Sequence, residues 1–244
     1  MIEYNIKLSF PLGANFFKSP NLLFYKKMMQ MIKKLNCVNS ERKCRDCPNK
    51  MVCNYYRLSG EDFLYYPGIV SKISLFDSKI YQENQELNLS FYLIGDCHQF
   101  SGYIDLFFQQ YLNQNIGGIP FYIKSFENKY FDEEEDSLSI RSCVIKTPIE
   151  REDLMGSYNQ MIEYYDHNYH CLYSKIKAET KVSNFKFSQI EDLHSKRMSG
   201  YIGSVFLSKI VDIPNILLEI GIGKFNYLGG GKIAIKDSAE KTEI

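Results

Sequence analysis

Apolar and polar residues alternate at the start of the chain, and this pattern predicts a β-strand. Residues 2–10 read IEYNIKLSF, with every second side chain apolar, which is the period of a strand with one buried face. Over residues 20–35 the apolar residues recur three and four apart, as on one face of a helix. Ser19 and Pro20 stand where an N-cap and a first helical residue are expected. The sequence therefore predicts a strand followed by a capped helix.

The patterns that follow predict the same order of elements twice. After the first helix we expect strands at 68–76 and 87–94, a helix at 98–114 and a strand at 120–127. Farther along we expect a strand at 137–148, a helix at 157–178, strands at 183–191 and 198–208, a helix at 213–223 and a strand at 231–237. Each half then has the order β-α-β-β-α-β, which is that of a ferredoxin-like unit.

This repeated order predicts an α+β protein made of two tandem ferredoxin-like (RRM-like) domains with antiparallel sheets. The acidic run DEEED, residues 132–136, is the expected linker. We therefore expect an N-terminal domain at residues 1–131, with an inserted cysteine loop at 37–53. The C-terminal domain is expected at residues 137–244 and contains a glycine-rich loop.

Composition narrows the class of protein. Of 244 residues, 45% are apolar, as in a folded globular protein. No apolar run approaches the roughly 20 residues of a membrane helix, and the N-terminus lacks the basic-then-apolar layout of a secretion signal. We therefore expect a cytoplasmic protein with no membrane partner.

Basic residues are concentrated near the N-terminus although the whole chain has no net charge. Between residues 7 and 57 lysine and arginine far outnumber acidic residues, while much of the compensating acid lies in DEEED. A basic face for a polyanion and an ordinary lysine-rich surface both fit this distribution.

Four of the seven cysteines are clustered after the first predicted helix. An odd total without an export signal argues against a disulfide framework. The spacing C-x6-C-x2-C-x5-C suits a tetrahedral zinc site, an iron–sulfur cluster has the same ligand number, and reduced packed thiols are the alternative without metal. The clustered residues are Cys37, Cys44, Cys47 and Cys53, and we expect Cys97, Cys143 and Cys171 to be small buried residues.

Glycines are concentrated near the C-terminus, in GIGKFNYLGGGKIAI at residues 221–235. A nucleotide-phosphate loop requires a strand, then glycines, then a helix, and here an apolar helix precedes the glycines and a strand follows. A tight structural turn explains the glycines. Contact between an RNA backbone and bare N–H groups also explains the flanking lysines. The residues concerned are Gly221, Gly223, Lys224, Gly229, Gly230, Gly231 and Lys232.

Several segments, in order along the chain, resemble one known family. LEIGIGKFNYLGGGKIAI resembles the glycine-rich signature of the RAMP superfamily of CRISPR-associated proteins, and is most similar to that of the endoribonuclease that processes precursor CRISPR RNA. CVNSERKCRDCPNKMVCNYY resembles a cysteine cluster that some members carry, and LSFYLIGDC the strand that enters their second helix. IKTPIE resembles the strand end that opens the second half, and LHSKRMSGYIGSV a basic stretch before a glycine-containing hairpin. These segments span residues 2–236.

The resemblance implies two ferredoxin-like domains and metal-independent cleavage of CRISPR repeat RNA. The 2′-hydroxyl of the substrate would attack the adjacent phosphate, giving a 2′,3′-cyclic phosphate and a 5′-hydroxyl, and DNA would resist cleavage because it lacks that hydroxyl. No cofactor is expected for catalysis, and zinc at the cysteine cluster would be structural.

Two other functions remain open at this stage. Family members often carry a catalytic histidine in or near the first helix, and this chain has no histidine before His98. A non-catalytic RAMP subunit that holds RNA in a CRISPR effector complex is therefore the first alternative. A metal-dependent protein of another class, centred on the cysteines, is the second.

Cleavage of this kind needs a base, an acid and cations near the developing phosphorane charge. Histidine suits proton transfer because its pKa lies near neutrality. His194 lies beside Lys196 and Arg197, so a proton donor and a phosphate clamp would be neighbours on one strand. His98 stands near a predicted helix start, where a phosphate is attracted. Surface or capping roles are the alternatives for both histidines.

The first helix offers Tyr25, Lys26 and Lys27 in place of an early histidine. A lysine can act as an acid or as a phosphate clamp. The candidates for catalysis are His194, His98, Tyr25 and Lys26. The candidates for RNA binding are Lys27, Lys196, Arg197 and the seven glycines and lysines of the glycine-rich segment. His167 and His170 would share a helix face, and we expect them to be structural.

Overall fold

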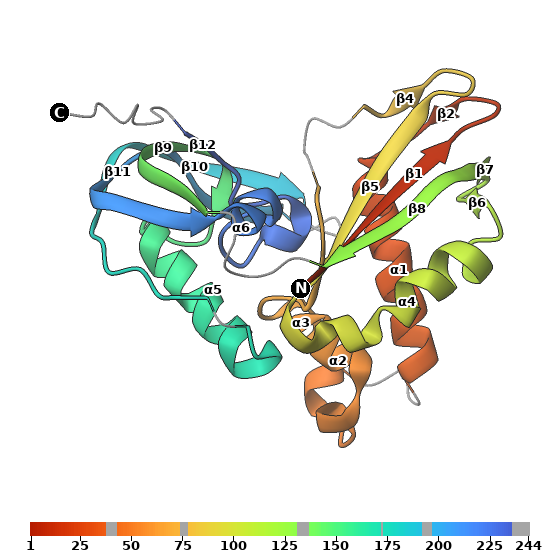
Figure 1. The fold of residues 1–244 in the computed structure, drawn as a ribbon, viewed down its shortest axis with the longest axis horizontal. Coiled ribbons are helices and arrows are strands. Elements are labelled where there is room, and N and C mark those ends of the chain that lie inside the picture. Colours follow the sequence, from red (N-terminus) through yellow and green to blue (C-terminus); the bar gives the residue numbers. More distant parts are fainter. Residues whose placement is uncertain (38–42, 74–77, 131–136, 172, 192–196, 236–244) are drawn as a thin grey trace. The chain divides into compact units, whose positions relative to one another are not determined.

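The structure is a computed structural model that describes residues 1–37, 43–73, 78–130, 137–171, 173–191 and 197–235. The chain divides into two units, Met1–Phe131 and Asp132–Ile244. Each unit is built on its own four-stranded sheet, as Figure 1 shows.

In the first unit the strands form an antiparallel sheet in the order β3-β5-β1-β8. The alternation at the N-terminus makes β1 a central strand because Tyr4, Ile6 and Leu8 are all buried. Ile6 pairs with Leu89 on one side and with Phe126 on the other. The strands are β1 (Ile2–Ser9), β3 (Ile69–Ser71), β5 (Glu86–Leu93) and β8 (Tyr122–Tyr130).

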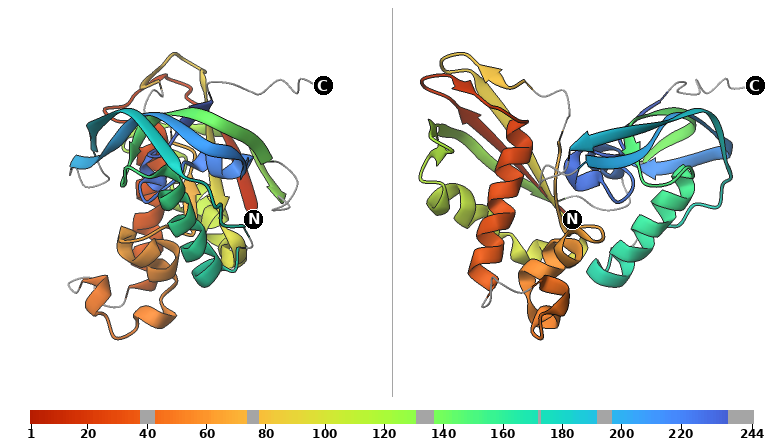
Figure 2. Two further views of the ribbon diagram at one scale, coloured as in Figure 1. Left: turned by 90° about the vertical axis from the view of Figure 1, so that its left-hand side faces the viewer. Right: turned by 180° about the vertical axis from the view of Figure 1, so that it is seen from behind.

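Helical segments pack on one face of this sheet (Figures 1 and 2). They are α1 (Pro20–Asn36) and α4 (Gly102–Leu106), the latter continued by a π-helical turn, η4 (Phe107–Tyr111). Phe24 of α1 stacks on Phe108 at 6.0 Å between ring centroids, and Phe108 meets Phe91 of β5 at 5.7 Å. Aromatic packing therefore joins helix to sheet in this core.

Short elements complete the first unit. Two antiparallel pairs, β2 with β4 and β6 with β7, lie outside the main sheet. The elements are β2 (Ala14–Asn15), η1 (Cys44–Asp46), η2 (Lys50–Val52), α2 (Asn54–Leu58), α3 (Gly60–Phe63), β4 (Ile80–Tyr81), η3 (Gly95–Phe100), β6 (Asn115–Ile116) and β7 (Ile119–Pro120). Of these, η1, η2 and η3 are 3-10 turns.

The second unit repeats the plan, with an antiparallel sheet in the order β10-β11-β9-β12. Buried tyrosines of α5, among them Tyr158, Tyr165 and Tyr169, contribute much of its core. The elements are β9 (Ser137–Ile149), α5 (Leu154–Tyr169), β10 (Thr180–Glu191), β11 (Arg197–Pro214), α6 (Asn215–Ile220), η5 (Asn226–Leu228) and β12 (Ile233–Ile235).

Strand order confirms the predicted fold class. Numbering the four sheet strands of each unit along the chain gives the spatial order 2-3-1-4 in both, with a helical segment after the first and third strands, as in a ferredoxin-like domain. Ser19 accepts a hydrogen bond from the backbone N–H of Leu22, and Pro20 opens α1, as the sequence predicted.

Several predicted elements have different ends in the structure, among them the strand expected at 198–208, which is β11 and runs on to Pro214. The helix expected at 157–178 ends at Tyr169 because His170 is left-handed, with φ 52°, a conformation that stops a helix. His170 is thus a helix cap and does not share a helix face with His167. The helix expected at 98–114 is three consecutive helical turns of different type. The strand expected at 68–76 is β3, and residues 74–77 lie outside the described residues.

Among the described residues, none of the helices combines the length and apolarity needed to cross a bilayer.

Candidate functional site

The three residues of α1 that were predicted to take part in catalysis or RNA binding differ in their exposure to solvent. Tyr25 is completely buried, and its hydroxyl donates to the carbonyl oxygen of Ile69 at 2.7 Å. Lys26 is half-buried and Lys27 is exposed. The Tyr25 hydroxyl therefore holds α1 against β3, which leaves Lys26 and Lys27 as the candidates on this helix that reach solvent.

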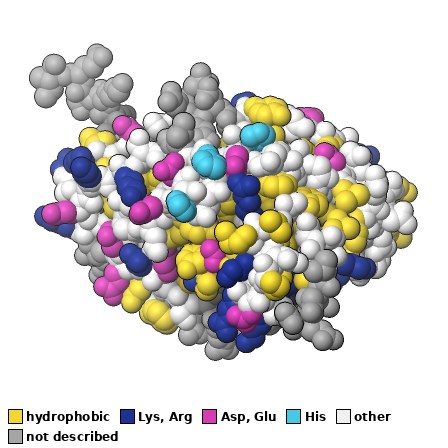
Figure 3. All heavy atoms as spheres, turned by 90° about the horizontal axis from the view of Figure 1, so that it is seen from below, with side chains coloured by type: hydrophobic (Ala, Val, Ile, Leu, Met, Phe, Trp, Pro, Cys, Tyr) yellow, Lys and Arg dark blue, Asp and Glu magenta, His cyan; other side chains and the backbone are white. Residues whose placement is uncertain are grey.

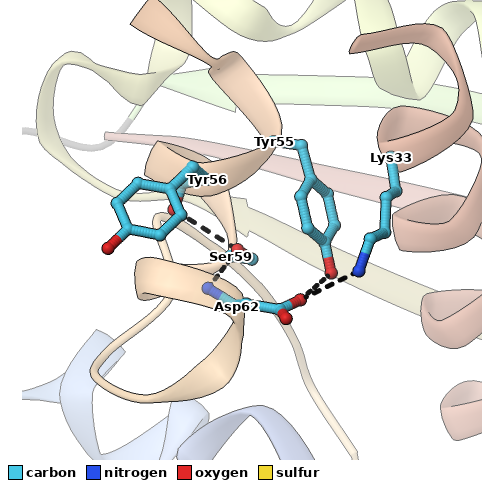
Figure 4. Close-up of polar contacts among 5 residues, drawn as sticks. All are labelled: Lys33, Tyr55, Tyr56, Ser59 and Asp62. Carbon is cyan, nitrogen blue, oxygen red and sulfur yellow. Dashed lines mark hydrogen bonds and ion pairs between the residues drawn. The ribbon is translucent and has the colours of Figure 1, made fainter. Parts of the chain in front are cut away.

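A polar cluster that the sequence did not predict lies beside α1 (Figure 4). The carboxylate of Asp62 accepts hydrogen bonds from the Tyr55 hydroxyl at 2.6 Å and from Lys33 Nζ at 3.3 Å. The Lys33 ammonium also lies 5.0 Å from the centroid of the Tyr55 ring. We call Lys33, Tyr55 and Asp62 the Asp62 cluster. It links α1, α2 and α3.

Asp62 belongs to a left-handed turn. Gly60, Glu61, Asp62 and Phe63 have φ angles of 59°, 60°, 61° and 65°, a region that costs energy for residues with a Cβ atom. Ser59 Oγ accepts the Asp62 backbone N–H at 2.8 Å. These contacts hold Asp62 in an unfavourable backbone conformation, as strained segments require.

The cluster shifts the pKa of its members upward. Burial lowers the pKa of Lys33, but the attraction and hydrogen bonding to Asp62 and to Cys44 together outweigh it, and the net pKa is raised. Burial and the hydrogen bond to Asp62 both raise the pKa of Tyr55. Burial and the hydrogen bond to Glu61 raise the pKa of Tyr56 to about 12. At neutral pH Lys33 is therefore a cation and both tyrosines are neutral donors.

The four clustered cysteines line one cavity with a volume of about 230 Å³. All four are free thiols and half-buried. Burial and the nearby Asp62 carboxylate raise the pKa of Cys44 to about 11. Within the part of the chain that the structure describes, no three His, Cys, Asp or Glu side chains converge closely enough to hold a metal ion. The zinc site predicted from the spacing is therefore not formed in this structure, and the thiols lie around the cavity instead.

The remaining cysteines have the predicted character. Cys97, Cys143 and Cys171 are fully buried. Burial raises the pKa of the Cys143 thiol to about 11 and also raises that of Cys97. These neutral, buried thiols are small core residues.

His98 is exposed at the turn η3. Its Nδ1 lies 3.0 Å from the carbonyl oxygen of Gly95, which favours a proton on Nδ1. Two residues earlier, both oxygens of Asp96 accept from Arg57 Nη2, at 2.8 and 2.7 Å. The turn that carries His98 is thus fixed to α2 by a bidentate ion pair, and the imidazole itself faces solvent.

Of the other three histidines, two lie at the surface and the third, His194, falls outside the described residues. His167 and His170 are exposed, and histidine side chains lie at the surface in Figure 3, among acidic and basic ones. His194 and Lys196 fall outside the described residues. Arg197 begins β11.

The glycine-rich segment folds back on itself. At Gly231, with φ 69°, a Cβ atom would stand 1.8 Å from the carbonyl oxygen of Ile222, and at Gly221, with φ 93°, it would stand 2.1 Å from that of Gly230. All five glycines are buried. Glycine is required here because two backbone stretches touch.

Most N–H groups of these glycines already have partners within the second unit. The N–H groups of Gly221 and Gly231 donate to the carbonyl oxygens of Leu217 and Pro148, at 3.0 and 3.1 Å. The N–H groups of Gly229 and Gly230 donate to the carbonyl oxygens of Asn226 and Phe225. This bonding favours the structural turn over the alternative of bare amides that bind phosphate.

The two lysines of the glycine-rich segment, Lys224 and Lys232, are bonded to different residues. Lys224 is half-buried, and its backbone N–H donates to Glu150 Oε2 at 3.0 Å. Lys232 donates through its backbone N–H to Thr147 Oγ1 at 2.8 Å and through Nζ to the carbonyl oxygen of Glu219. Thr147 and Glu150 anchor the segment to the end of β9. The IKTPIE motif contained both residues, but its sequence did not indicate this role.

Solved structures are similar to this chain in fold over nearly its whole length. An RAMP protein described as binding different RNA substrates aligns with a TM-score of 0.50 at 15% identity, covering 97% of this chain and 100% of its own. This chain has the RAMP fold. The product of a Cas6-related gene from Pyrococcus furiosus aligns with a TM-score of 0.50 at 14% identity, covering 97% and 98%. A Cas6 product complex aligns at 0.52 and 9% identity, covering 96% and 99%.

The likeness to RAMP and Cas6 structures confirms the resemblance at the level of the fold. No protein-family model and no curated protein matches the sequence. At the identities found, the comparison concerns the path of the backbone and carries no information on individual side chains.

Proposed function

We propose that this protein is an endoribonuclease that processes CRISPR repeat RNA. The observation that carries the proposal is the pair of ferredoxin-like units with one strand order, in a chain whose backbone aligns over nearly its whole length with an RAMP protein described as binding different RNA substrates and with a Cas6 product complex. The ordered sequence segments, from the cysteine cluster to the glycine-rich ending, support the same family.

The proposed reaction is metal-independent. The 2′-hydroxyl of the RNA attacks the adjacent phosphate, a base removes its proton, and an acid protonates the departing 5′-oxygen, leaving a 2′,3′-cyclic phosphate. His98 suits proton transfer because its imidazole faces solvent. Lys26 suits the acid or clamp role on α1, and His194 remains a candidate. Tyr25 is set aside because its hydroxyl is buried and bonded to Ile69.

The proposed RNA contacts are made by side chains. The exposed Lys27 and the half-buried Lys224 and Lys232 are the described candidates, and Lys196 and Arg197 are added from the sequence. The glycines of the segment take part by shaping the loop that carries two of these lysines. Phosphate contacts of this kind are sensitive to salt.

The decisive experiment is incubation of the full-length protein with repeat RNA in excess EDTA. We expect cleavage at one position, with a cyclic phosphate identified by mass spectrometry, and no cleavage when the 2′-hydroxyl at that position is replaced by hydrogen. Lys26→Ala and His98→Ala test the two described candidates, and His194→Ala the third. His167→Ala, an exposed histidine of α5, is the matched control and should cleave normally.

A second candidate function is that of a non-catalytic RAMP subunit that holds RNA in a CRISPR effector complex. It is favoured by the absence of histidine from α1 and by the engaged hydroxyl of Tyr25. Tight binding of repeat RNA without cleavage would support this function and exclude the nuclease. RNA from several repeat families that is neither bound nor cut would contradict both.

A further inference from the structure

The two sides of the sheet in the second unit differ in exposure. Val205 of β11 lies opposite Cys143 of β9, and both are completely buried on the side covered by α5 (Figures 1 and 2). The next residue along a strand points to the other side, and there Phe206 is 47% exposed. We call this other side the open face. The residues on it that matter below are Val144, Lys146, Lys181, Lys186, Ile202 and Phe206.

The open face presents a strip of apolar side chains to solvent. Phe206 and Ile202 are four residues apart on β11, about 13 Å along a strand. Val144 lies opposite Ser204, between them, on the neighbouring strand β9. Ile202 and Val144 are half-buried, and β11 and β9 are the two central strands of the sheet. In sheets of the RRM type, aromatic side chains at such positions stack on RNA bases.

Three lysines flank this apolar strip. On β10, Lys181 lies opposite Phe206. Farther along the same strand, Lys186 lies opposite Ile202. Lys146 stands on β9, on the other side of β11, and all three lysines are exposed. Among the described residues, no carboxylate forms an ion pair with any of these ammonium groups. Apolar surface between unpaired cations suits a nucleic-acid strand, whose bases stack while its phosphates bind cations.

The equivalent face of the first sheet has a different pattern of charge. There Glu3 lies opposite Lys129, and Lys7 forms an ion pair with Glu86 at 3.5 Å. The aromatic residue of that face, Tyr92, is completely buried, and its hydroxyl donates to Glu3 at 2.9 Å. An exposed ring beside unpaired lysines is therefore a property of the second unit and does not follow from the shared strand order.

We propose that the open face of the second sheet binds an unpaired segment of RNA, an inference that rests on the proposed RNA function. Phe206 stacks on one base and Ile202 supports the next, while the three lysines bind phosphates on either side of them. The segment is single-stranded because the bases of a duplex are already stacked on one another. Stacking and phosphate contacts tolerate any base, so this face should bind with little sequence preference.

The test is the binding of a short fluorescein-labelled oligouridylate to the full-length protein, measured by fluorescence anisotropy in EDTA. Phe206→Ala should weaken binding by about five- to 100-fold, the range found when one ring that stacks on a base is removed. Phe206→Tyr should keep the affinity because it keeps the ring. Phe187→Ala is the matched control, since Phe187 is 61% exposed on β10 but lies opposite Tyr201, on the other side of the sheet. It should bind as the wild type does.

The lysines have a separate readout, the dependence of affinity on salt. Lys181→Ala/Lys186→Ala should weaken binding and reduce the slope of log affinity against log salt by about 1.4, since each phosphate contact with a single strand contributes about 0.7. Lys7→Ala/Lys129→Ala makes the same change in charge on the equivalent face of the first sheet. In that control, affinity and slope should both stay at their wild-type values.

Crosslinking tests the contact without any substitution. Irradiation of the wild-type protein with an oligouridylate that contains 5-iodouridine should link the RNA to the peptide that carries Phe206, as identified by mass spectrometry. Thermal unfolding of each variant checks that it is folded. A variant that does not fold leaves the crosslink as the deciding measurement, and crosslinks confined to other peptides would contradict the proposal.

Three further outcomes would overturn this inference. The first is unchanged affinity in Phe206→Ala, or an equal loss in Phe187→Ala. The second is a wild-type protein that cuts repeat RNA but does not bind oligouridylate. The third is self-association that Phe206→Ala abolishes while RNA affinity is unchanged, because the open face would then be a protein interface. If repeat RNA is not cut in EDTA but oligouridylate binding depends on Phe206, the nuclease proposal fails and this inference stands.

Discussion

At the scale of single residues, Asp62 is the centre of a polar cluster in the first unit. Its carboxylate accepts hydrogen bonds from the Tyr55 hydroxyl and from Lys33 Nζ. The backbone of Asp62 itself has a left-handed conformation. A charged acceptor strengthens a hydrogen bond, so these contacts can offset the backbone strain of the turn.

Replacement of Tyr55 by Phe tests the strongest contact of the Asp62 cluster. The change deletes one donor to a carboxylate in a mostly buried position, and we expect a loss of about 1–3 kcal/mol in the free energy of unfolding. Urea denaturation followed by circular dichroism measures it. Tyr56→Phe is the matched control because Tyr56 donates to Glu61 from a more exposed position, and it should cost less. Equal losses in the two variants would contradict the special role of Asp62.

The same cluster predicts how stability depends on alkaline pH. Tyr55 and Lys33 have pKa values above their ordinary ones in the folded protein. In the unfolded chain tyrosine loses its proton near pH 10 and lysine slightly higher, while the folded protein keeps both. Their contribution is fully present below pH 10 and is lost as pH rises further. We expect the free energy of unfolding to fall more steeply between pH 9 and pH 11 in the wild type than in Tyr55→Phe. Parallel curves for the two proteins would count against this assignment.

Gly231 gives the sharpest test at one position of the glycine-rich segment. Gly231→Ala would place a methyl group 1.8 Å from the Ile222 carbonyl oxygen, and we expect a loss of more than about 3 kcal/mol, measured by thermal and urea unfolding. Gly117→Ala is the control, since Gly117 is also left-handed at φ 60° but has open space around it. It should cost about 1–2 kcal/mol. Similar losses would mean that backbone conformation alone, and not close packing, requires Gly231.

At the scale of elements, sequence predicted the strands and helices that have one apolar face. β1 and α1 match their patterns closely because burial on one side repeats with the period of the element. The apolar pattern did not predict the ends and turns that depend on the backbone conformation of single residues. The end of α5 depends on the left-handed His170, and Gly60 alone gives no signal that the next three residues share its conformation.

The N-cap of α1 carries the element-scale prediction. Ser19 Oγ accepts the N–H of Leu22 at 3.4 Å, so Ser19→Ala should lower the free energy of unfolding by about 1 kcal/mol. Ser19→Asp should restore or exceed the wild-type value because a carboxylate is favourable at a helix N-terminus. Urea denaturation of the three proteins is the measurement. If Ser19→Ala is neutral, the cap is not a significant support of this helix.

At the scale of the whole molecule, each unit has a complete sheet, its own helices and its own apolar core. We expect a fragment of residues 1–131 to fold alone, with a cooperative urea transition and dispersed amide resonances. A fragment of residues 1–84, which lacks β5 and β8, should not. Failure of the longer fragment to fold would show that its core depends on the second unit.

Only part of the candidate site could be predicted from the sequence. The cysteine cluster and the glycine-rich segment could be found because their residues are close along the chain. The Asp62 cluster could not be, because Lys33 and Asp62 are 29 positions apart and nothing in their local sequence links them. For the same reason the anchoring of the glycine-rich segment by Glu150, 74 positions before Lys224, emerges only from the fold.

The inward bonding of the glycine-rich segment has an evolutionary consequence. Because its amides and its tight backbone contacts maintain the second unit itself, substitutions there should be removed by selection for folding in any relative that keeps this fold, whether or not that relative cuts RNA. The signature would then mark ancestry and architecture, and a relative without enzymatic activity would display it as well.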